Sequence, residues 1–499
     1  MNRQALIFVD SSILNDNPLT FNGQFIPDTI KAALQSLPAI ESMHYCIPES
    51  YSGKLQQEAS VFTYSGPDTP EIWHQIFTKT GAHHIIKIPA DAAFFQASII
   101  SEMLDTHIKY LSEFTFSYNL PSGYACEIIS KSVLENPLAN PTLNTSLCDI
   151  VKSNLNQFDV ELYYKEPDLR WHRVNFRAAN IRDRLVMQNI IAVNNQIPPY
   201  ELLQDIIDSH PEVLFTTPSY VEIELCGNCT LDCIFCYRNV LSPKHENMEL
   251  STLQTLLDAM RFFNTPYAVC FGGSGEPLQH PQFLKALEMC NNEELIHTIL
   301  VETNGILADA GYASALASFK DNKITTIVNI NGHNAETYKK LHNADQFTIV
   351  HGNILKLKEI LEAHNKLNNN LYIQILKINE TESFLDSYYD FWEQHNIPII
   401  LQKQNTYIGR ITDRRYSDLT PLQRKPCWHL RQDLYILSDG TIAFCKQDID
   451  GAAKRGNITT DDLKAIWEQQ KEHFVNDYRQ NRAKKPNCMS CDEWYTYNL

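Results

Sequence analysis

The stretch Cys229-Thr230-Leu231-Asp232-Cys233-Ile234-Phe235-Cys236 (CTLDCIFC, residues 229–236) spaces three cysteines as CxxxCxxC. Three thiolates at this spacing can hold three irons of a [4Fe–4S] cluster, whereas iron–sulfur clusters normally have four cysteine ligands. The fourth iron would then have no cysteine and would be free to bind another molecule. The stretch therefore predicts a cluster that takes part in chemistry rather than one that only stores electrons.

Two other interpretations of these cysteines depend on Cys226, which precedes the stretch. A zinc ribbon would use Cys226 and Cys229 as its first CxxC pair, but such sites separate their pairs by about 15–20 residues. Cys226 as a fourth cluster ligand would resemble a ferredoxin, in which the spacing differs and the fourth cysteine binds another cluster. We expect Cys226 to be a free thiol near the cluster, because a fourth ligand would close the open iron.

Length, charge and cysteine usage limit the class of protein. A chain of 499 residues is too long for one core, and about two to four domains are expected. The formal charge of −17 argues against a nucleic-acid-binding face, which needs clustered lysines and arginines. No apolar run is long enough to span a membrane, and the start lacks the features of a signal peptide. Eight of the 13 cysteines fall in two groups, four within 226–236 and four at or beyond 427, which favours metal sites in a cytoplasmic protein over disulfides.

Short apolar strands alternate regularly with helical segments from Tyr220 onward. We expect strands at 221–225, 267–271, 298–302, 325–330, 371–376 and 398–402. This alternation predicts a parallel sheet, either doubly wound or a partial barrel, with its functional site at the carboxyl ends of the strands. The three-cysteine stretch directly follows the first strand and so falls at that site.

A glycine-rich motif, GGSGEPL at 272–278, follows the second of these strands. Glycines allow the backbone to approach a ligand closely, and the carboxylate of Glu276 at a strand end could hold an ammonium group. A short glycine motif is a weak signal by itself and is often an ordinary turn. Its position one strand after the cysteines favours a functional role.

Together these motifs resemble the radical S-adenosylmethionine (SAM) superfamily, whose signature CxxxCxφC has an aromatic residue before the last cysteine and whose GGEP element binds SAM. Ser274 departs from the commonest form of that element. The resemblance implies that the open iron chelates SAM, that an electron from a donor such as flavodoxin or ferredoxin cleaves it, and that the resulting 5′-deoxyadenosyl radical abstracts hydrogen from a substrate. It implies a cluster bound by Cys229, Cys233 and Cys236, and SAM contacts from Phe235, Gly273, Ser274, Gly275 and Glu276.

Weaker similarities to the same family occur on the later strands. Asn304 lies in a stretch, ETNG, that resembles the end of the family's third strand, Asn329 ends the fourth strand, and Gln374 lies on the fifth. The resemblance implies contacts with the ribose or carboxylate of SAM. Each of these residues could equally be a polar group in a turn or at a strand end.

The last 80 residues carry four cysteines, Cys427, Cys445, Cys488 and Cys491, in a small region whose core would benefit from a metal. The region resembles the SPASM/twitch extension of many radical SAM enzymes. A full SPASM domain usually has seven cysteines, so four imply a single auxiliary [4Fe–4S] cluster or an abbreviated domain. A structural zinc bound by four cysteines is the alternative.

The amino-terminal region mixes strands and helices and resembles a degenerate GT-A-type nucleotidyltransferase, with Asp91 at the metal position or as a helix cap. The glycine-rich phosphate loop of such enzymes is absent, and Val9-Asp10-Ser11-Ser12 stands in its place. We therefore expect four regions: an α/β domain (1–135), a connecting region (136–215), a partial (β/α)6 radical SAM barrel (216–415) and a small cysteine-rich Fe–S domain (420–499). This whole arrangement resembles the spiro-SPASM proteins.

The predicted function is hydrogen abstraction by a SAM-derived radical. SPASM-containing relatives often modify peptides or proteins, so a peptide or protein is the first expected substrate, and a sugar or nucleotide is the second. Two different classes stay open: a nucleotidyl or glycosyl transferase with structural clusters, and an iron–sulfur electron carrier. No residue is identified as a hydrogen donor or catalytic base.

Overall fold

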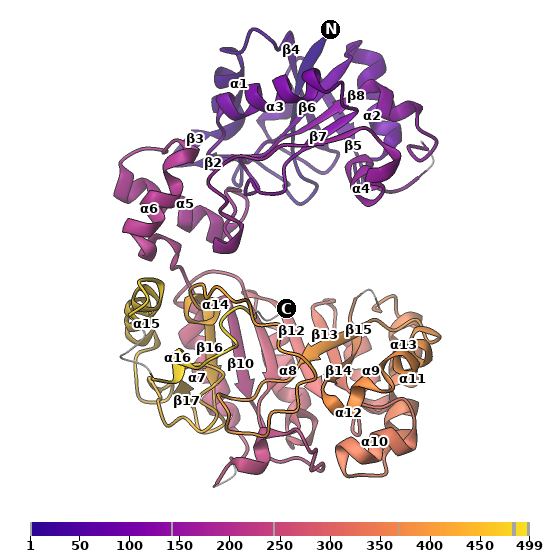
Figure 1. Cartoon of the computed structure of the whole chain (residues 1–499), viewed down its shortest axis with the longest axis vertical. Coiled ribbons are helices and arrows are strands. Elements are labelled where there is room, and N and C mark those ends of the chain that lie inside the picture. Colours follow the sequence, from indigo (N-terminus) through magenta and orange to yellow (C-terminus); the bar gives the residue numbers. More distant parts are fainter. Residues whose placement is uncertain (1, 141–142, 243–244, 368, 482–485, 497–499) are drawn as a thin grey trace. The chain divides into compact units, whose positions relative to one another are not determined.

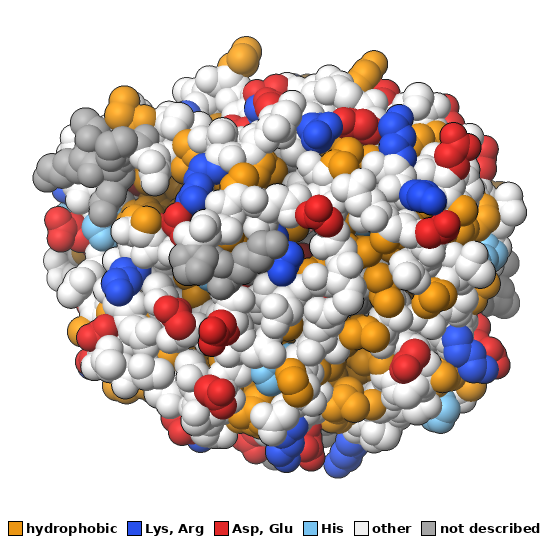
Figure 2. Space-filling view, turned by 90° about the horizontal axis from the view of Figure 1, so that it is seen from below, with side chains coloured by type: hydrophobic (Ala, Val, Ile, Leu, Met, Phe, Trp, Pro, Cys, Tyr) orange, Lys and Arg blue, Asp and Glu red, His pale blue; other side chains and the backbone are white. Residues whose placement is uncertain are grey.

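The structure, a computed structural model, describes residues 2–140, 143–242, 245–367, 369–481 and 486–496. The chain divides into two compact units, residues 1–214 and 215–499 (Figure 1). None of the described helices is both long enough and apolar enough to cross a membrane. Acidic and basic side chains are interspersed on the face seen in Figure 2.

The first unit is built on a seven-stranded mixed sheet in the order β5-β4-β1-β6-β8-β7-β9. Strand β8 runs antiparallel to both of its neighbours, and the other pairs are parallel. The strands are β1 (Arg3–Phe8), β4 (Ser42–Pro48), β5 (Val61–Tyr64), β6 (His84–Pro89), β7 (Phe114–Phe116), β8 (Glu127–Ser130) and β9 (Val160–Leu162), with a small hairpin of β2 (Thr20–Phe21) and β3 (Gln24–Phe25). The helices are α1 (Ile26–Leu34), α2 (Pro70–Thr80), α3 (Ala97–Lys109), α4 (Leu147–Ser153), α5 (Ile181–Asn194) and α6 (Leu203–Ser209). This is the expected alternation of strands and helices.

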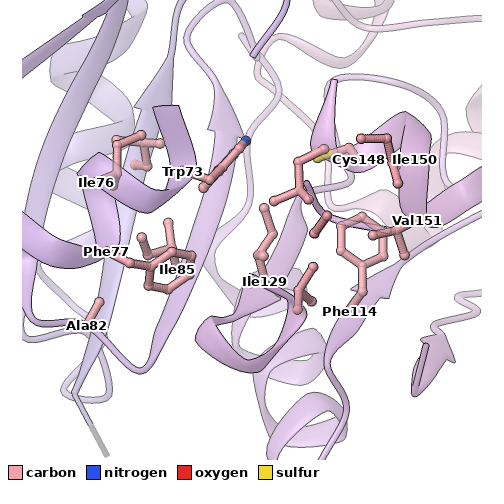
Figure 3. Close-up of a cluster of buried hydrophobic side chains, with 14 of the residues drawn as sticks. Trp73, Ile76, Phe77, Ala82, Ile85, Phe114, Ile129, Cys148, Ile150 and Val151 are labelled. Carbon is pink, nitrogen blue, oxygen red and sulfur yellow. The ribbon is translucent and has the colours of Figure 1, made fainter. Parts of the chain in front are cut away.

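The region 136–215, expected as a connection, differs from that expectation. Its strand β9 pairs with β7, and Leu147, Cys148 and Val151 of α4 belong to the buried cluster drawn in Figure 3. In that cluster they lie with Trp73 and Phe77 of α2. The apolar residues between the asparagines and prolines of this region therefore complete the core of the first unit.

Asp91, expected as a metal ligand or helix cap, lies after β6 with a fully buried side chain. Its carboxylate pairs with the Arg177 guanidinium and accepts a hydrogen bond from the Ala179 N–H. Helix α3 has Gln96, not Asp91, as its N-cap residue. Asp91 thus ties β6 to the segment 177–179, and the helix-cap interpretation is wrong.

The second unit contains a nine-stranded sheet in the order β15-β14-β13-β12-β11-β10-β16-β17-β18. Strands β10 to β15 are all parallel, which confirms the six predicted strands of the barrel. These are β10 (Tyr220–Glu224), β11 (Tyr267–Gly272), β12 (Ile296–Thr303), β13 (Ile324–Asn329), β14 (Leu371–Lys377) and β15 (Ile399–Lys403). The helices between them are α7 (Leu250–Arg261), α8 (Phe283–Asn291), α9 (Ala310–Ser318), α10 (Ala335–His342), α11 (Phe347–Ala363), α12 (Asn379–Glu382) and α13 (Leu385–Glu393).

The carboxyl-terminal region, expected as a small cysteine-rich domain, extends this same sheet. Strand β16 (Asp433–Ile436) pairs in parallel with β10, and β17 (Thr441–Ala443) and β18 (Gly456–Asn457) continue the sheet antiparallel. Helices α14 (Trp428–Gln432), α15 (Leu463–Tyr478) and α16 (Pro486–Met489) complete the region. Since the unpaired edge of β10 would expose backbone polar groups, its pairing with β16 joins the two predicted regions into one unit.

Candidate functional site

A cavity of about 530 Å³ lies at the carboxyl ends of the parallel strands in the second unit. Tyr220 and Leu300, which belong to a cluster of buried apolar side chains, form part of its lining. The residues that the sequence singled out as a radical SAM site meet on its wall, although they come from segments far apart in the chain. These are Cys229, Cys233, Phe235, Cys236, Gly273, Ser274, Gly275, Glu276, Asn304, Asn329 and Gln374.

Several N–H groups lie near the sulfurs of the cysteine loop, residues 229–236. Cys229 Sγ lies 3.4 Å from the Leu231 backbone nitrogen and 3.7 Å from Asn304 Nδ2. Cys233 Sγ lies 3.1 Å from Nδ1 of His342. Donors of this kind stabilise negative charge on thiolate ligands and tune iron–sulfur clusters. Cys229, Cys233 and Cys236 line one cavity and have such donors near their sulfurs, and their role as ligands of a [4Fe–4S] cluster stays a prediction.

Cys226 is buried, and its thiol donates a weak hydrogen bond to the Asn228 carbonyl oxygen at 3.5 Å. Burial raises the pKa of this thiol, which favours its protonated form. Burial also raises the pKa of Cys229, Cys233 and Cys236, so this shift does not separate Cys226 from the three predicted ligands. The role of Cys226 as a free thiol beside the cluster stays a prediction.

The glycine-rich loop packs directly against the cysteine loop. Gly273 has φ +97°, and a Cβ there would lie 2.8 Å from the Glu224 Cβ. A Cβ at Gly275 would lie 2.0 Å from the Cys226 carbonyl oxygen, so no other residue fits without a shift. We expected these glycines to admit a ligand, and that role stays a prediction. The structure shows that they allow the two loops to pack closely, which brings the two motifs into one site.

Ser274, between the two glycines, has a buried side chain. Its backbone N–H donates to Glu224 Oε2 at 3.0 Å. The backbone N–H and the hydroxyl of Ser274 both help to lower the pKa of Glu224. Ser274 therefore links the glycine-rich loop to the end of β10 and also lines the cavity.

Glu276 lies buried at the end of the glycine-rich motif. Its carboxylate accepts hydrogen bonds from Thr303 Oγ1 at 2.7 Å, the Asn304 N–H at 2.7 Å and the Leu278 N–H at 3.1 Å. Burial raises the pKa of Glu276 to about 7 despite these donors. A cationic ammonium group beside the carboxylate would offset that burial.

The residues predicted on the fourth and fifth strands form a polar pair. Gln374 Nε2 donates to Asn329 Oδ1 on the neighbouring strand. Asn331, two residues further on, accepts the Leu376 N–H at 2.7 Å and is buried. Asn329 and Gln374 line the cavity and could contact a ligand, while the Asn331 side chain joins two strand ends.

Sequence reasoning missed a charged group inside the same cavity, formed by Glu222, Glu302 and Lys446. Lys446 Nζ lies 2.8 Å from Glu222 Oε2. Burial alone would lower the pKa of Lys446. The negative charges of Glu222 and Glu302 outweigh this effect, so the pKa of Lys446 is raised. Burial raises the pKa of Glu302, whose carboxylate has no hydrogen bond within the described residues. The sequence did contain a signal for this group, because Glu222 and Glu302 each interrupt an otherwise apolar strand.

The four carboxyl-terminal cysteines gather around the ends of α14, β17 and α16. The Trp428 N–H donates to the Trp494 carbonyl oxygen at 3.2 Å, so the segments that carry Cys427 and Cys491 lie side by side. The Glu493 N–H donates to Cys491 Sγ at 3.4 Å. Four cysteines are the usual ligand set of an iron–sulfur cluster, and their role here stays a prediction. Lys446, next to Cys445, reaches the cavity described above.

Seven cysteines fall in two groups, and the three of the first group line the cavity. The seven are the predicted ligands of two iron–sulfur clusters. Residues 223–379 match the family model of the Radical SAM superfamily, and residues 427–492 match SPASM, an iron–sulfur cluster-binding domain. The chain therefore carries a radical SAM domain, which marks it as an enzyme, followed by a SPASM domain. Its cofactors are a SAM-binding [4Fe–4S] cluster, SAM and an auxiliary iron–sulfur cluster.

Similar proteins are known from sequence and structure. An uncharacterized protein of Treponema pallidum (strain Nichols) is 27% identical over 367 residues, which cover 70% of this chain and 97% of that protein. The structure of anSMEcpe with bound AdoMet is 16% identical and covers 56% of this chain and 84% of that one, with a TM-score of 0.41. Streptococcus suis SuiB bound to its precursor peptide SuiA is 16% identical and covers 60% and 76%, with a TM-score of 0.43.

Proposed function

We propose that this enzyme uses a SAM-derived radical to abstract hydrogen from a peptide or protein bound in the 530 Å³ cavity. The observation that carries the proposal is the shared lining of that cavity. Residues of the cysteine loop and the glycine-rich loop form one side, and Lys446, Gln447 and Glu493 of the SPASM region form another. The resemblance to SPASM-containing enzymes, which often modify peptides or proteins, supports a substrate of this class.

The cluster and SAM supply the hard step, a carbon-centred radical able to break a C–H bond, when they are bound. The residues of this chain bind and orient them. Cys229, Cys233 and Cys236 would hold the cluster, and Glu276 would hold the amino group of SAM. Ser274, which lines the same cavity, would contact a second polar group of the ligand.

The polar pair on the fourth and fifth strands would complete the SAM site. Asn329 and Gln374 present amide groups to the cavity and could bind the ribose or carboxylate of SAM. Asn304 would contribute through its amide, which already lies near Cys229. These assignments place the adenosyl part of SAM over the strand ends, next to the charged group of Glu222, Glu302 and Lys446.

The other parts of the chain have proposed roles as well. An external reductant such as flavodoxin or ferredoxin would supply the electron that cleaves SAM. The auxiliary cluster of Cys427, Cys445, Cys488 and Cys491 would accept an electron from the substrate or bind it. We propose that the first unit presents substrate rather than catalyses a transfer, because the basic side chains of its own cavity are already paired with carboxylates.

The experiment that tests the proposal is isotope transfer. Anaerobically reconstituted, reduced protein would be incubated with SAM and with deuterated peptides, sugars or nucleosides, and 5′-deoxyadenosine would be analysed by mass spectrometry. We expect deuterium in 5′-deoxyadenosine from a peptide. Deuterium from sugars or nucleosides alone would support the second substrate class and contradict the peptide proposal.

A further inference from the structure

His342 is the last residue of α10, and its side chain is held rigidly beside the cysteine loop. The residue is 1% exposed. Its ring stacks on Tyr338, with centroids 4.3 Å apart and an angle of 24°, and meets the Phe235 ring edge to face at 5.6 Å. Two aromatic contacts therefore fix the plane of the imidazole.

The hydrogen bonds of the ring assign its tautomer. Nε2 lies 3.1 Å from the backbone nitrogen of Asn331. A backbone N–H can only donate, so Nε2 is the acceptor and carries no proton. A neutral imidazole has its single hydrogen on the other nitrogen. Nδ1 therefore carries the hydrogen, and it lies 3.1 Å from Cys233 Sγ.

The residues on either side of His342 hold the cysteine loop in register with the ring. The Ile234 N–H donates to the Leu341 carbonyl oxygen at 3.1 Å. The Asn343 side chain donates to the Asp232 carbonyl oxygen at 2.8 Å. Three consecutive residues, 341–343, thus contact three consecutive residues, 234–232, in opposite order. The contact between His342 Nδ1 and Cys233 Sγ is the middle one of these three.

The other two cysteines of the loop are different. The Cys229 sulfur has the nearby Leu231 backbone donor at 3.4 Å and the Asn304 amide at 3.7 Å, a longer contact. Cys236 has a backbone donor from Arg238. In the described residues, Cys233 is the loop cysteine whose sulfur faces an imidazole N–H. The three ligands are therefore not equivalent.

We propose that His342 is a positioning residue that donates its Nδ1 hydrogen to the Cys233 thiolate and raises the reduction potential of the cluster. The added electron increases negative charge on the cluster and its sulfurs, so an N–H donor stabilises the reduced form more than the oxidised form. The inference rests on the cluster site and is independent of the substrate proposed above. Its consequence is easier reduction of the enzyme before SAM cleavage.

The test is a redox titration of the reconstituted full-length protein, followed by EPR of the signal that changes when SAM is added. His342→Phe keeps a ring between Tyr338 and Phe235 but removes the N–H. His342→Asn keeps a side-chain N–H near the position of Nδ1. Both variants lack the acceptor for the Asn331 N–H, so the difference between them reports the donor to Cys233.

We expect His342→Phe to lower the equilibrium constant for reduction about tenfold, equivalent to ~59 mV for one electron, and His342→Asn to restore most of it. Equal shifts in the two variants would show a merely structural role and overturn the proposal, as would no shift in either. Iron and sulfide content of each variant verifies that the cluster is bound.

A measurement on the unaltered protein keeps the proposal testable if neither variant folds. Protein labelled with ¹⁵N only in histidine would be reduced and studied by pulsed EPR. We expect a weak ¹⁵N coupling to the SAM-binding cluster, which is lost in unlabelled protein. Absence of any histidine coupling would contradict the hydrogen bond. Because no substrate is added, failure of the peptide proposal would leave this result unchanged.

Discussion

Each unit of the chain has a cavity at the carboxyl ends of its parallel strands. The two cavities differ in whether their charged side chains have hydrogen-bond partners. In the first, of about 400 Å³, Lys87 pairs with Asp68 at 2.9 Å and with Glu127 at 3.3 Å, and Lys152 also pairs with Glu127. In the second, of about 530 Å³, the Glu302 carboxylate has no hydrogen bond within the described residues and lies near Glu222 and Lys446. A carboxylate that lines a cavity without a hydrogen bond is a candidate contact for a ligand, and this one shares its cavity with the three cysteines of residues 229–236.

The largest effect is expected when one of the three cysteines in the second cavity is removed. Cys233→Ala should abolish cleavage of SAM to methionine and 5′-deoxyadenosine in reduced, reconstituted protein, because an open cluster needs all three thiolates. Cys226→Ala is the matched control, and it should leave most of the cleavage intact. Equal loss in the two variants would make Cys226 a ligand and remove the open iron. The products would be quantified by chromatography.

The next effect concerns Glu276 and pH. Its pKa of about 7 means that the carboxyl is largely protonated below neutral pH, whereas an ammonium group binds the deprotonated form. SAM affinity should therefore rise as pH increases through 7, and it should fall about tenfold for each pH unit below that. Calorimetry at pH 6, 7 and 8 measures this dependence. Glu276→Gln should bind SAM weakly at all three values, and a retained slope in that variant would assign the titration to another group.

A smaller effect is expected at Glu302. Glu302→Gln keeps the shape of the side chain but removes a carboxylate that faces the cavity beside Lys446. We expect substrate-dependent turnover to fall about tenfold, as for loss of one charged contact, while cleavage of SAM without substrate changes little. Glu294→Gln, on the exposed segment before the same strand, is the control. An equal effect on both activities would place Glu302 in the SAM site instead.

The smallest effect on catalysis is expected in the first unit. Lys87→Met removes the partner of Asp68 and one partner of Glu127, so it should lower the free energy of unfolding by about 3 kcal/mol. SAM cleavage should stay within about twofold, because the cluster and the glycine-rich motif lie in the other unit. Denaturant unfolding and product analysis measure the two quantities, with the exposed Lys79→Met as control. A large loss of cleavage would overturn the assignment of catalysis to the second unit alone.

The sequence predicted the barrel well because its strands are short, apolar and regularly spaced. The expected strand 371–376, for example, corresponds to β14 at Leu371–Lys377. Parallel strands end at one edge of a sheet, so Cys229, Glu276 and Asn304 could be predicted to meet without knowledge of the contacts between them.

Other features depended on contacts that no local pattern encodes. His342 reaches Cys233 across 109 positions of the chain, and Lys446 reaches Glu222 across 224. The pairing of β16 with β10 is also non-local, so the sequence did not predict that the carboxyl-terminal region extends the sheet. Residues 136–215 were expected as a connection because they are rich in asparagine and proline, although buried apolar residues such as Leu147 and Val151 pack into the core of the first unit.

The central claim is that the cluster bound by Cys229, Cys233 and Cys236 has an iron open to SAM. The most direct measurement is the EPR spectrum of the reduced protein before and after SAM is added. The account predicts a changed spectrum for one cluster and an unchanged spectrum for the auxiliary cluster, whose four cysteines complete its ligation. Spectra of both clusters that are identical with and without SAM would contradict it.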